Sequence, residues 1–451
     1  MRERTSPVDL SDRWCARLLG WLAALLCLLL PPGAPTLAAP PPAEARAAAQ
    51  LERARETRAF TEQHYQYLAG GPDCPRAVFV SYRHSERAPD ISDQWYDVSQ
   101  IWADLALAPP DEPLARCWAI RGFTFLDRLW DRATPIGGFF PRSDLDGEQV
   151  VKVDKYADDN SLAGLAWLEA ASLSPDPLER ELMLARARAT ADFLMEGDLW
   201  DDTFGGGFWW NTHRGDMLEG KPAQTNGLAA EFFLQLYGMT DEPAYRAWAE
   251  NLLDWLDRRL YEPAARLYRW SIHFDDRQQH RGEQVSDRFF SYDQSILIEA
   301  HLLAYRLLGG EERHLERARS LGRRLDPVFW DDGHGGYNLE AGIPQVFTVY
   351  SAWLTPGLLL LYEQDGDPYW LDRASANVDA LNRTVRDPAS GGYAQRHYLC
   401  RDPNAPGCGG GAPWAIGPER QVVDQAWMQR AQALLATALL RSAPEPRKPG
   451  L

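Results

Sequence analysis

The chain has 451 residues, of which 45% are hydrophobic, and a formal net charge of −17. A sequence of this length and composition can bury a large core, and its acidity argues against nucleic acid and anionic membrane surfaces as partners. It contains none of the fingerprints of a P-loop, a dinucleotide-binding turn or a serine-hydrolase elbow. Its 18 Trp residues suit both core packing and the stacking of sugar rings.

The N-terminus has the pattern of a targeting segment. Basic residues precede an apolar stretch from Leu18 to Leu30, which is too short to span a bilayer comfortably. Small residues around Thr36-Leu37-Ala38 then offer a cleavage site. We therefore predict that residues 1–38 are a signal peptide and that the mature protein is secreted or periplasmic, with no stable membrane insertion. An uncleaved anchor is the alternative.

Two kinds of helix alternate along the rest of the chain. A Pro/Ala-rich linker leads into a predicted helix from Ala43 to Leu68. Beyond residue 90, apolar runs that open with a polar step alternate with charged, amphipathic segments, as two concentric layers of helices require. The apolar runs begin near Ser92, Asp159, Thr225, Tyr292, Phe347 and Gln421. The amphipathic segments are Glu112–Arg132, Asp176–Glu196, Glu242–Leu260, Glu311–Leu325 and Tyr369–Val385.

The polar steps recur with a long period. The amides of Gln94, Asn160, Asn226 and Gln294 are spaced 66, 66 and 68 residues apart, which is the length of one helical hairpin with its loops. The helix after the linker can fill a sixth outer position and close a ring. We predict an all-α (α/α)6 toroid of six helical hairpins, with an open α-solenoid as the alternative. The predicted boundaries are 39–90 for the linker and first helix, 91–442 for the toroid, and 443–451 for a flexible tail.

Gly-Gly-aromatic steps recur in the loops after the amphipathic segments. Such a step suits a tight turn that enters a short extended segment, and it can place aromatic rings at one rim of the fold. The four steps are Gly137-Gly138-Phe139-Phe140, Gly205-Gly206-Gly207-Phe208-Trp209-Trp210, Gly335-Gly336-Tyr337 and Gly391-Gly392-Tyr393.

Four cysteines follow the targeting segment, an even number for an exported chain. Cys400 and Cys408 flank a Pro/Gly-rich loop, so we predict a local disulfide there, with Cys74–Cys117 as the other pair. No CxxC or HxxxH spacing is present. The sequence therefore predicts neither a metal site nor a cofactor.

Asp158 and Asp159 stand out because only this polar step carries two adjacent acids. Acids at a helix start ordinarily cap the helix and face its dipole. These two, however, lie at the end that all the apolar helices share, and glycoside hydrolysis requires two carboxyl groups. Adjacent residues at a loop–helix junction can hold carboxyls about 5–6 Å apart, which is near the separation of retaining enzymes.

Four motifs in order resemble glycoside hydrolase family 76, whose members are (α/α)6 endo-α-1,6-mannanases. They are Tyr156-Ala157-Asp158-Asp159-Asn160, Leu199-Trp200-Asp201-Asp202 with the Gly-rich turn through Asn211, Lys221 with Thr225-Asn226-Gly227, and Ser291-Tyr292-Asp293-Gln294. The resemblance is good from about residue 154 to 325. It implies that Asp158 is the nucleophile and Asp159 the acid/base. Ser161 and Asp293 depart from the family pattern, which bears on substrate preference more than on reaction type.

Further residues in these motifs are candidate sugar ligands. Helix capping is the alternative for the amides, and core packing is the alternative for the Trp pair. Asp201 and Asp202 form a second acidic pair, which we expect to be solvated in a loop. The candidate ligands are Tyr156, Asn160, Trp209, Trp210, Asn226, Tyr292, Asp293 and Gln294.

The predicted function is therefore a secreted, monomeric glycoside hydrolase that acts on a polysaccharide or oligosaccharide. It would cleave α-1,6-mannosidic or related α-glycan linkages by a retaining two-Asp mechanism. One alternative is a sugar epimerase of the same fold, which needs His bases such as His301 or His397. Another is a non-catalytic glycan-binding toroid, which needs aromatic and amide groups but not two acids.

Overall fold

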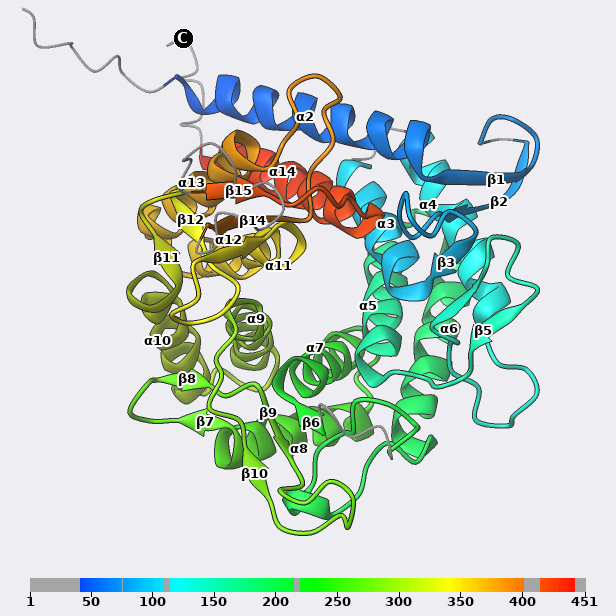
Figure 1. The fold of residues 1–451 in the computed structure, drawn as a ribbon. Coiled ribbons are helices and arrows are strands. Elements are labelled where there is room, and N and C mark those ends of the chain that lie inside the picture. Colours follow the sequence, from blue (N-terminus) through cyan, green and yellow to red (C-terminus); the bar gives the residue numbers. More distant parts are fainter. Residues whose placement is uncertain (1–40, 75, 109–112, 215–219, 401–413, 443–451) are drawn as a thin grey trace, which may run out of the picture. The chain divides into compact units, whose positions relative to one another are not determined.

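The helices of the computed structural model form two concentric rings (Figure 1). The model describes residues 41–74, 76–108, 113–214, 220–400 and 414–442. The inner helices in this part are α3 (Gln94–Leu107), α5 (Ala157–Leu173), α7 (Ala223–Thr240), α9 (Ser291–Leu307), the consecutive α11 (Thr348–Ala352) and α12 (Leu354–Asp365), and α14 (Val422–Ser442). The outer helices are α2 (Ala43–His64), α4 (Pro113–Leu126), α6 (Pro177–Glu196), α8 (Pro243–Arg259), α10 (Glu312–Phe329) and α13 (Pro368–Thr384).

The inner ring is closed. Each inner helix packs against the next one along the chain, and α14 packs back against α3. Helix α2 packs on α14 and so occupies the sixth outer position, as the sequence predicts. The predicted (α/α)6 toroid is therefore confirmed. The first helix ends at His64 rather than Leu68, because residues 66–70 pair with a second strand instead.

Burial explains why the two layers differ in sequence. Inner helix α5 buries residues on nearly every side, whereas outer helix α10 buries one stripe that includes Leu315, Leu321 and Leu325. An amphipathic helix needs one apolar face, and a helix enclosed by others needs apolar residues all round. The alternating pattern along the chain is thus the direct consequence of the two rings.

Short antiparallel strands join the helices at one end of the rings. They form the pairs β1 (Gln66–Gly70) with β2 (Ala77–Tyr82), β7 (Tyr261–Glu262) with β8 (Leu267–Tyr268), and β11 (Trp330–Asp331) with β12 (Gly336–Tyr337). Three-stranded sheets contain β3 (Ile91–Asp93), β4 (Arg142–Asp144) and β5 (Val150–Lys152); β6 (Lys221–Pro222), β9 (Ser271–His273) and β10 (Gln284–Val285); and β13 (Gln345–Phe347), β14 (Arg396–Leu399) and β15 (Trp414–Ile416). Single-turn 3-10 helices lie at Asp127–Leu129 and Thr203–Gly205.

An amide on the fourth residue of an inner helix fixes the extended segment beside it. The Asn160 Oδ1 accepts from the Phe139 amide at 2.8 Å, while its Nδ2 donates to the Tyr156 carbonyl at 2.7 Å. The same three-way contact, to the N–H and C=O of one residue and to the carbonyl four residues back, recurs in α7, α9 and α14. The amides involved are Asn226, Gln294 and Gln425.

These amide clamps correct two expectations from the sequence. Asn160, Asn226 and Gln294 are fully buried and spend their hydrogen bonds on backbone groups, so they are structural residues and not sugar ligands. In α3 the fourth residue is Asp97, which accepts from the Tyr82 amide at 2.9 Å, so Gln94 is not the equivalent residue. The first aromatic ring after each Gly-Gly turn, at Phe139, Phe208, Tyr337 and Tyr393, is buried in the core and does not line a rim.

One predicted disulfide lies wholly within the described residues. Cys74 and Cys117 are bonded and tie the β1–β2 loop to α4, which confirms that pair. Cys400 is also disulfide-bonded, but Cys408, its predicted partner, lies outside the described residues, as do the predicted signal peptide and tail. Among the helices that the model describes, none is long and apolar enough to cross a membrane.

Candidate active site

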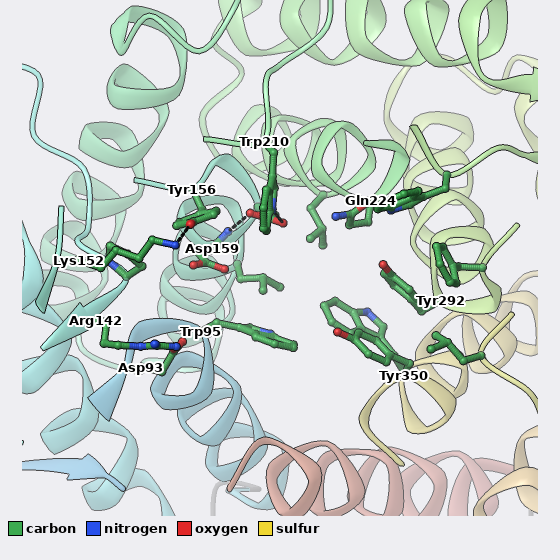
Figure 2. A pocket seen from close by; sticks show the side chains of 18 of the residues that line it. Asp93, Trp95, Arg142, Lys152, Tyr156, Asp159, Trp210, Gln224, Tyr292 and Tyr350 are labelled. Carbon is green, nitrogen blue, oxygen red and sulfur yellow. Dashed lines mark hydrogen bonds and ion pairs between the residues drawn. The ribbon is translucent and has the colours of Figure 1, made fainter. Parts of the chain in front are cut away.

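A cavity of about 490 Å³ opens at the N-terminal ends of the inner helices. Figure 2 shows side chains from opposite sides of the ring pointing into it. Its titratable lining consists of Asp93, Asp158, Asp159, Arg142, Lys152, Arg288 and the phenols of Tyr156, Tyr292 and Tyr350. Its other aromatic residues are Trp95, Trp210, Trp270, Phe290 and Trp353. The cavity therefore combines sugar-sized space, aromatic walls and paired acids.

Asp158 is held by donors. The Trp210 Nε1 donates to its Oδ2 at 2.9 Å, the Thr225 hydroxyl lies 3.4 Å from the same oxygen, and the Asp159 amide donates to Oδ1 at 3.0 Å. Burial raises the pKa of Asp158 to about 6, and the Trp210 hydrogen bond acts against that rise. The carboxyl is thus prepared to ionise close to neutral pH.

Asp159 has a different environment, although it is the next residue. Its carboxyl accepts no hydrogen bond from any residue that the model describes. Burial, then the charge of Asp158, then that of Asp93 raise the pKa of Asp159 well above its ordinary range, while Lys152 and Arg142 oppose this. A proton shared by the two acids therefore belongs on Asp159.

The two acids thus have complementary states. One carboxylate with donors and one protonated neighbour without them is the division of labour that acid-catalysed glycosyl transfer requires. Helix α5 positions both, because Tyr156 precedes it and the two acids occupy its first turn. The Ala157 amide also donates to the Trp210 carbonyl at 2.9 Å, which ties the segment around Trp210 to the start of the helix.

Tyr156 and Trp210 line the cavity, as the sequence predicts for sugar-contacting residues. Their rings meet edge to face, with centroids 4.8 Å apart, and the Lys152 Nζ donates to the Tyr156 hydroxyl. Trp210 thus has a second role that stacking alone does not give it, because its indole N–H reaches Asp158.

Behind Trp210, a buried ion pair fixes the Gly-rich turn. The Lys221 Nζ is fully buried and donates to the Asp201 Oδ1 at 2.7 Å and to the carbonyls of Thr203 and Gly206. The Asp201 Oδ2 accepts from the Trp209 Nε1 at 2.9 Å. Asp201 is therefore a structural anchor rather than a solvated loop residue, and Trp209 faces this anchor instead of the cavity. Asp202 is exposed, as expected.

On the opposite side, Tyr292 lines the cavity and stacks on Tyr350 with centroids 4.5 Å apart. Asp293 and Gln294 are fully buried and do not line it. Of the ten residues predicted for the site, the structure therefore places Tyr156, Asp158, Asp159, Trp210 and Tyr292 in the cavity.

Sequence reasoning missed several lining residues. Asp93 and Trp95 lie in the polar step before the first inner helix, so the repeat itself was the signal that could have found them. Arg142 and Lys152 lie on the β4–β5 hairpin, whose sequence gives no sign that it folds over the acids. Arg288, Trp270 and Trp353 likewise follow no motif.

The histidines named for an epimerase lie elsewhere. The His301 Nε2 is 2.8 Å from the Tyr268 hydroxyl and its Nδ1 is 2.9 Å from the Nδ1 of His314, all within the core. Neither His301 nor His397 lines the cavity. Within the described residues no group of three His, Cys, Asp or Glu side chains is arranged to hold a metal ion.

Comparison with known proteins shows similarity to a family of glycoside hydrolases. A family model described as glycosyl hydrolase family 76 matches residues 148–350. A search of curated protein sequences found no match. A GH76 α-mannanase of Bacteroides thetaiotaomicron has a TM-score of 0.68 at 16% identity, covering 89% of this chain and 100% of its own. An inactive variant of the α-1,6-mannanase GH76A of Salegentibacter, in complex with α-1,6-mannotriose, has a TM-score of 0.61 at 18% identity, covering 86% and 99%.

A cellobiose 2-epimerase of Bacillus thermoamylovorans is also similar, with a TM-score of 0.63 at 12% identity, covering 86% of this chain and 99% of its own. At such identities the likeness to solved structures shows the fold, and the fold hosts more than one chemistry. The family match adds a reaction class, which the fold alone does not give. The fold and the match together indicate a glycoside hydrolase, and residues 148–350 are similar to glycosyl hydrolase family 76.

Proposed function

We propose that this protein is a retaining endo-α-1,6-mannanase, with Asp158 as nucleophile and Asp159 as acid/base. The single observation that carries the proposal is the divided environment of the two adjacent acids: Asp158 has donors from Trp210 and Asp159, whereas Asp159 has none from the described residues. The α-1,6-mannan substrate follows from the family resemblance and from the Salegentibacter enzyme. Its inactive variant has two adjacent aspartates replaced by asparagine and holds α-1,6-mannotriose.

The reaction proceeds in two balanced steps. In the first, the Asp158 carboxylate attacks the anomeric carbon while Asp159 gives its proton to the glycosidic oxygen, so that the leaving sugar departs with a hydroxyl group. An ester between the sugar and Asp158 results. In the second, the Asp159 carboxylate takes a proton from water, the hydroxide attacks the same carbon, and Asp158 leaves. Two inversions give net retention.

The surroundings of the acids support this cycle. When Asp158 is esterified its negative charge is lost, which removes one of the influences that raise the pKa of Asp159. Asp159 can then act as a base in the second step, aided by the positive charges of Lys152 and Arg142. The proposal includes export, which the predicted signal peptide would direct.

Product analysis on a panel of α-mannans and other α-glycans tests the proposal. We expect α-1,6-linked mannan to be shortened to oligosaccharides of several lengths early in the reaction, because endo action cuts within the chain. Release of mannose alone would contradict endo action, and cleavage of another linkage only would contradict the substrate. An epimerase would instead change the ratio of free sugars without cleaving any bond, but none of the described histidines lines the cavity.

A further inference from the structure

Three charged residues form a row across the sheet that covers the acids. In the registers of β3, β4 and β5, Asp93 is opposite Arg142, and Arg142 is opposite Lys152. Directly opposed residues on neighbouring strands project from the same face of a sheet. All three line the cavity, and Figure 2 shows Asp93 and Arg142 together beside the Trp95 ring.

The ion pair between Asp93 and Arg142 uses only some of the hydrogen-bonding atoms of the two side chains. The Arg142 Nη2 and Nε both donate to the Asp93 Oδ2, at 2.8 and 3.2 Å. The Asp93 Oδ1 and the Arg142 Nη1 bind no residue that the model describes. Asp93 itself is 8% exposed, so it is a nearly buried carboxylate with one oxygen left for a ligand. A charged acceptor and a charged donor thus lie side by side at the cavity wall.

Two adjacent hydroxyl groups of a sugar fit this arrangement. One hydroxyl donates to the free carboxylate oxygen, the next accepts from the guanidinium, and both hydrogen bonds are strengthened by charge. The Trp95 ring adjoins the pair and offers an apolar surface to the sugar face. The charges of Arg142 and Asp93 cancel, so the pair favours a neutral hexose over an anion.

The pair lies on the acid/base side of the two catalytic carboxyls. Asp93 and Arg142 both influence the ionisation of Asp159, while the leading influences on Asp158 are burial and hydrogen-bond donors that include Trp210 and Gln224. In Figure 2, Asp93, Arg142 and Trp95 lie on one side of Asp159, and Trp210 and Gln224 lie on the other. The acid must reach the glycosidic oxygen, so the sugar that leaves with this oxygen lies toward Asp159.

We propose that Asp93, Arg142 and Trp95 form the subsite that binds the leaving hexose, with the ion pair gripping two neighbouring hydroxyls and Trp95 supporting the ring. This inference rests on the proposed hydrolysis. It assigns a role to residues that lie outside the four motifs of the family resemblance, and it makes them specificity-determining residues rather than members of the acid pair.

The test variant is Asp93→Asn/Arg142→Gln. It removes one negative and one positive charge, so the net charge around Asp159 is kept while the charged donor and acceptor are lost. The matched control is Arg269→Gln/Glu262→Gln, because these two residues form an ion pair at 2.8 Å and neither of them lines the cavity. Two substrates are compared: α-1,6-mannotetraose, and an aryl α-1,6-mannobioside whose aryl leaving group makes no hydroxyl contacts.

We expect the test variant to lose at least about tenfold in kcat/KM on mannotetraose, since two charge-assisted hydrogen bonds are lost. On the aryl substrate its kcat/KM should stay within about threefold of wild type, and the alkaline limb of its pH profile should not move. The control variant should show no such difference between the two substrates. Equal losses on both substrates, no loss on mannotetraose, or a shifted alkaline limb would each overturn the subsite.

Two further arms keep the test decisive. If the double variant does not fold, Trp95→Leu must show the same selective loss on mannotetraose, and an equal loss on both substrates overturns the proposal. If wild type cleaves neither substrate, the proposed function has failed, and calorimetric binding of α-1,6-mannotriose decides the subsite. Weaker binding by the double variant but not by the control supports it, whereas unchanged binding, or no binding by wild type, overturns it.

Discussion

At the scale of single residues, two neighbouring carboxyls differ because of what lies beside each. Asp158 accepts from the Trp210 indole and from the Asp159 amide, whereas the Asp159 carboxyl accepts no hydrogen bond from a described residue and is exposed to the charges of Asp158 and Asp93. The resemblance of the sequence to a known family indicates the pair, and the structure supplies the reason why the two can take different roles. Trp210 was predicted as a stacking ring, yet its N–H also donates to Asp158, the proposed nucleophile.

Trp210→Phe should therefore change the pH profile as well as the rate. The proposed nucleophile must act as a carboxylate, so we expect kcat/KM to rise as the pH increases through the pKa of Asp158, about 6. Loss of the indole donor removes an influence that lowers this pKa. We expect the acidic limb to move to higher pH and kcat/KM at pH 6 to fall on the order of tenfold or more.

Trp209→Phe is the matched control for Trp210→Phe. Its indole donates to Asp201 and not to the nucleophile, so the acidic limb should stay in place. Measuring kcat/KM from pH 4 to 9 for both variants decides the matter. The same shift in both variants, or none in Trp210→Phe, would contradict a positioning role for this hydrogen bond.

At the scale of elements, the repeated amide clamps fasten each extended segment to an inner helix. An Asn or Gln at the fourth position of an inner helix gives the same sequence pattern whether its side chain binds a sugar or the backbone. For this reason the sequence predicted Asn226 as a substrate ligand. Only the fold reveals that its hydrogen bonds are filled. The Lys221–Asp201 pair fastens the Gly-rich turn in a similar way, with the ammonium group wholly removed from water.

Asn226→Ala should destabilise the protein and leave substrate affinity unchanged. The substitution leaves the Phe208 N–H and two carbonyls without buried partners, so we expect a loss of about 2–4 kcal/mol in the free energy of unfolding. Gln425→Ala removes the equivalent clamp in α14 and should cost a similar amount. Urea titration and KM on α-1,6-mannan measure the two quantities. A raised KM with unchanged stability would restore Asn226 as a sugar ligand.

Asp201→Asn should also act on stability. Removing the carboxylate leaves the buried Lys221 without its counter-charge, and breaking one side of a buried pair costs about 3–5 kcal/mol. Since the Asp201 side chain is 28% exposed, the lower end of that range is expected. Asp202→Asn, on the exposed neighbour, should change the unfolding free energy by less than about 0.5 kcal/mol. Equal thermal shifts in the two variants would refute the anchor.

At the scale of the whole molecule, the closed ring brings charged groups from several inner helices together in its core. Arg430 of α14 is paired with Glu169 of α5, and it also attracts Glu231 of α7 and Glu299 of α9. Burial raises the pKa of Glu231 to about 7 and that of Glu299 well above its ordinary range. The one positive charge of Arg430 does not neutralise three nearby carboxylates, so we expect some of these carboxyls to be protonated. The stability of the core should therefore depend on pH.

Glu231→Gln tests this dependence. A raised pKa means that the stabilising contribution of protonated Glu231 is complete below the unfolded value near 4.5 and is lost as the pH rises through about 7. Gln keeps the acceptor for Gln235 and cannot ionise. We expect the variant to unfold at a higher temperature than wild type at pH 8, by an amount that shrinks toward pH 5. A pH-independent difference would contradict the buried titration.

Much of the ring could be predicted from the sequence because its physical causes are local. Apolar and amphipathic helices alternate, and the helix Ala43–His64 fits the sixth outer position by simple counting. The prediction that Gln94 is the repeated residue of the first hairpin was wrong, because Asp97 makes the corresponding contact with the backbone there. An acid and an amide three residues apart satisfy the same pattern, so the sequence alone does not separate them.

The cavity was predictable only in part because its walls come from distant segments. Asp158 and Asp159 are adjacent in the chain and belong to a recognisable motif. Arg142 and Lys152 reach the same cavity through the register of a short hairpin, and Tyr350 does so through closure of the ring. Those contacts depend on tertiary packing, which the local pattern does not encode.

The most direct test of the central claim is mass spectrometry of the trapped intermediate. Asp159→Ala lacks the base for the second step, while an aryl α-1,6-mannobioside needs little acid help in the first, so a glycosyl ester should accumulate. The account predicts an added mass of one mannobiosyl group on the intact protein, mapped by peptide digestion to Asp158. A label on any other residue, or turnover of the substrate by Asp159→Ala with inverted product and no label, would contradict it.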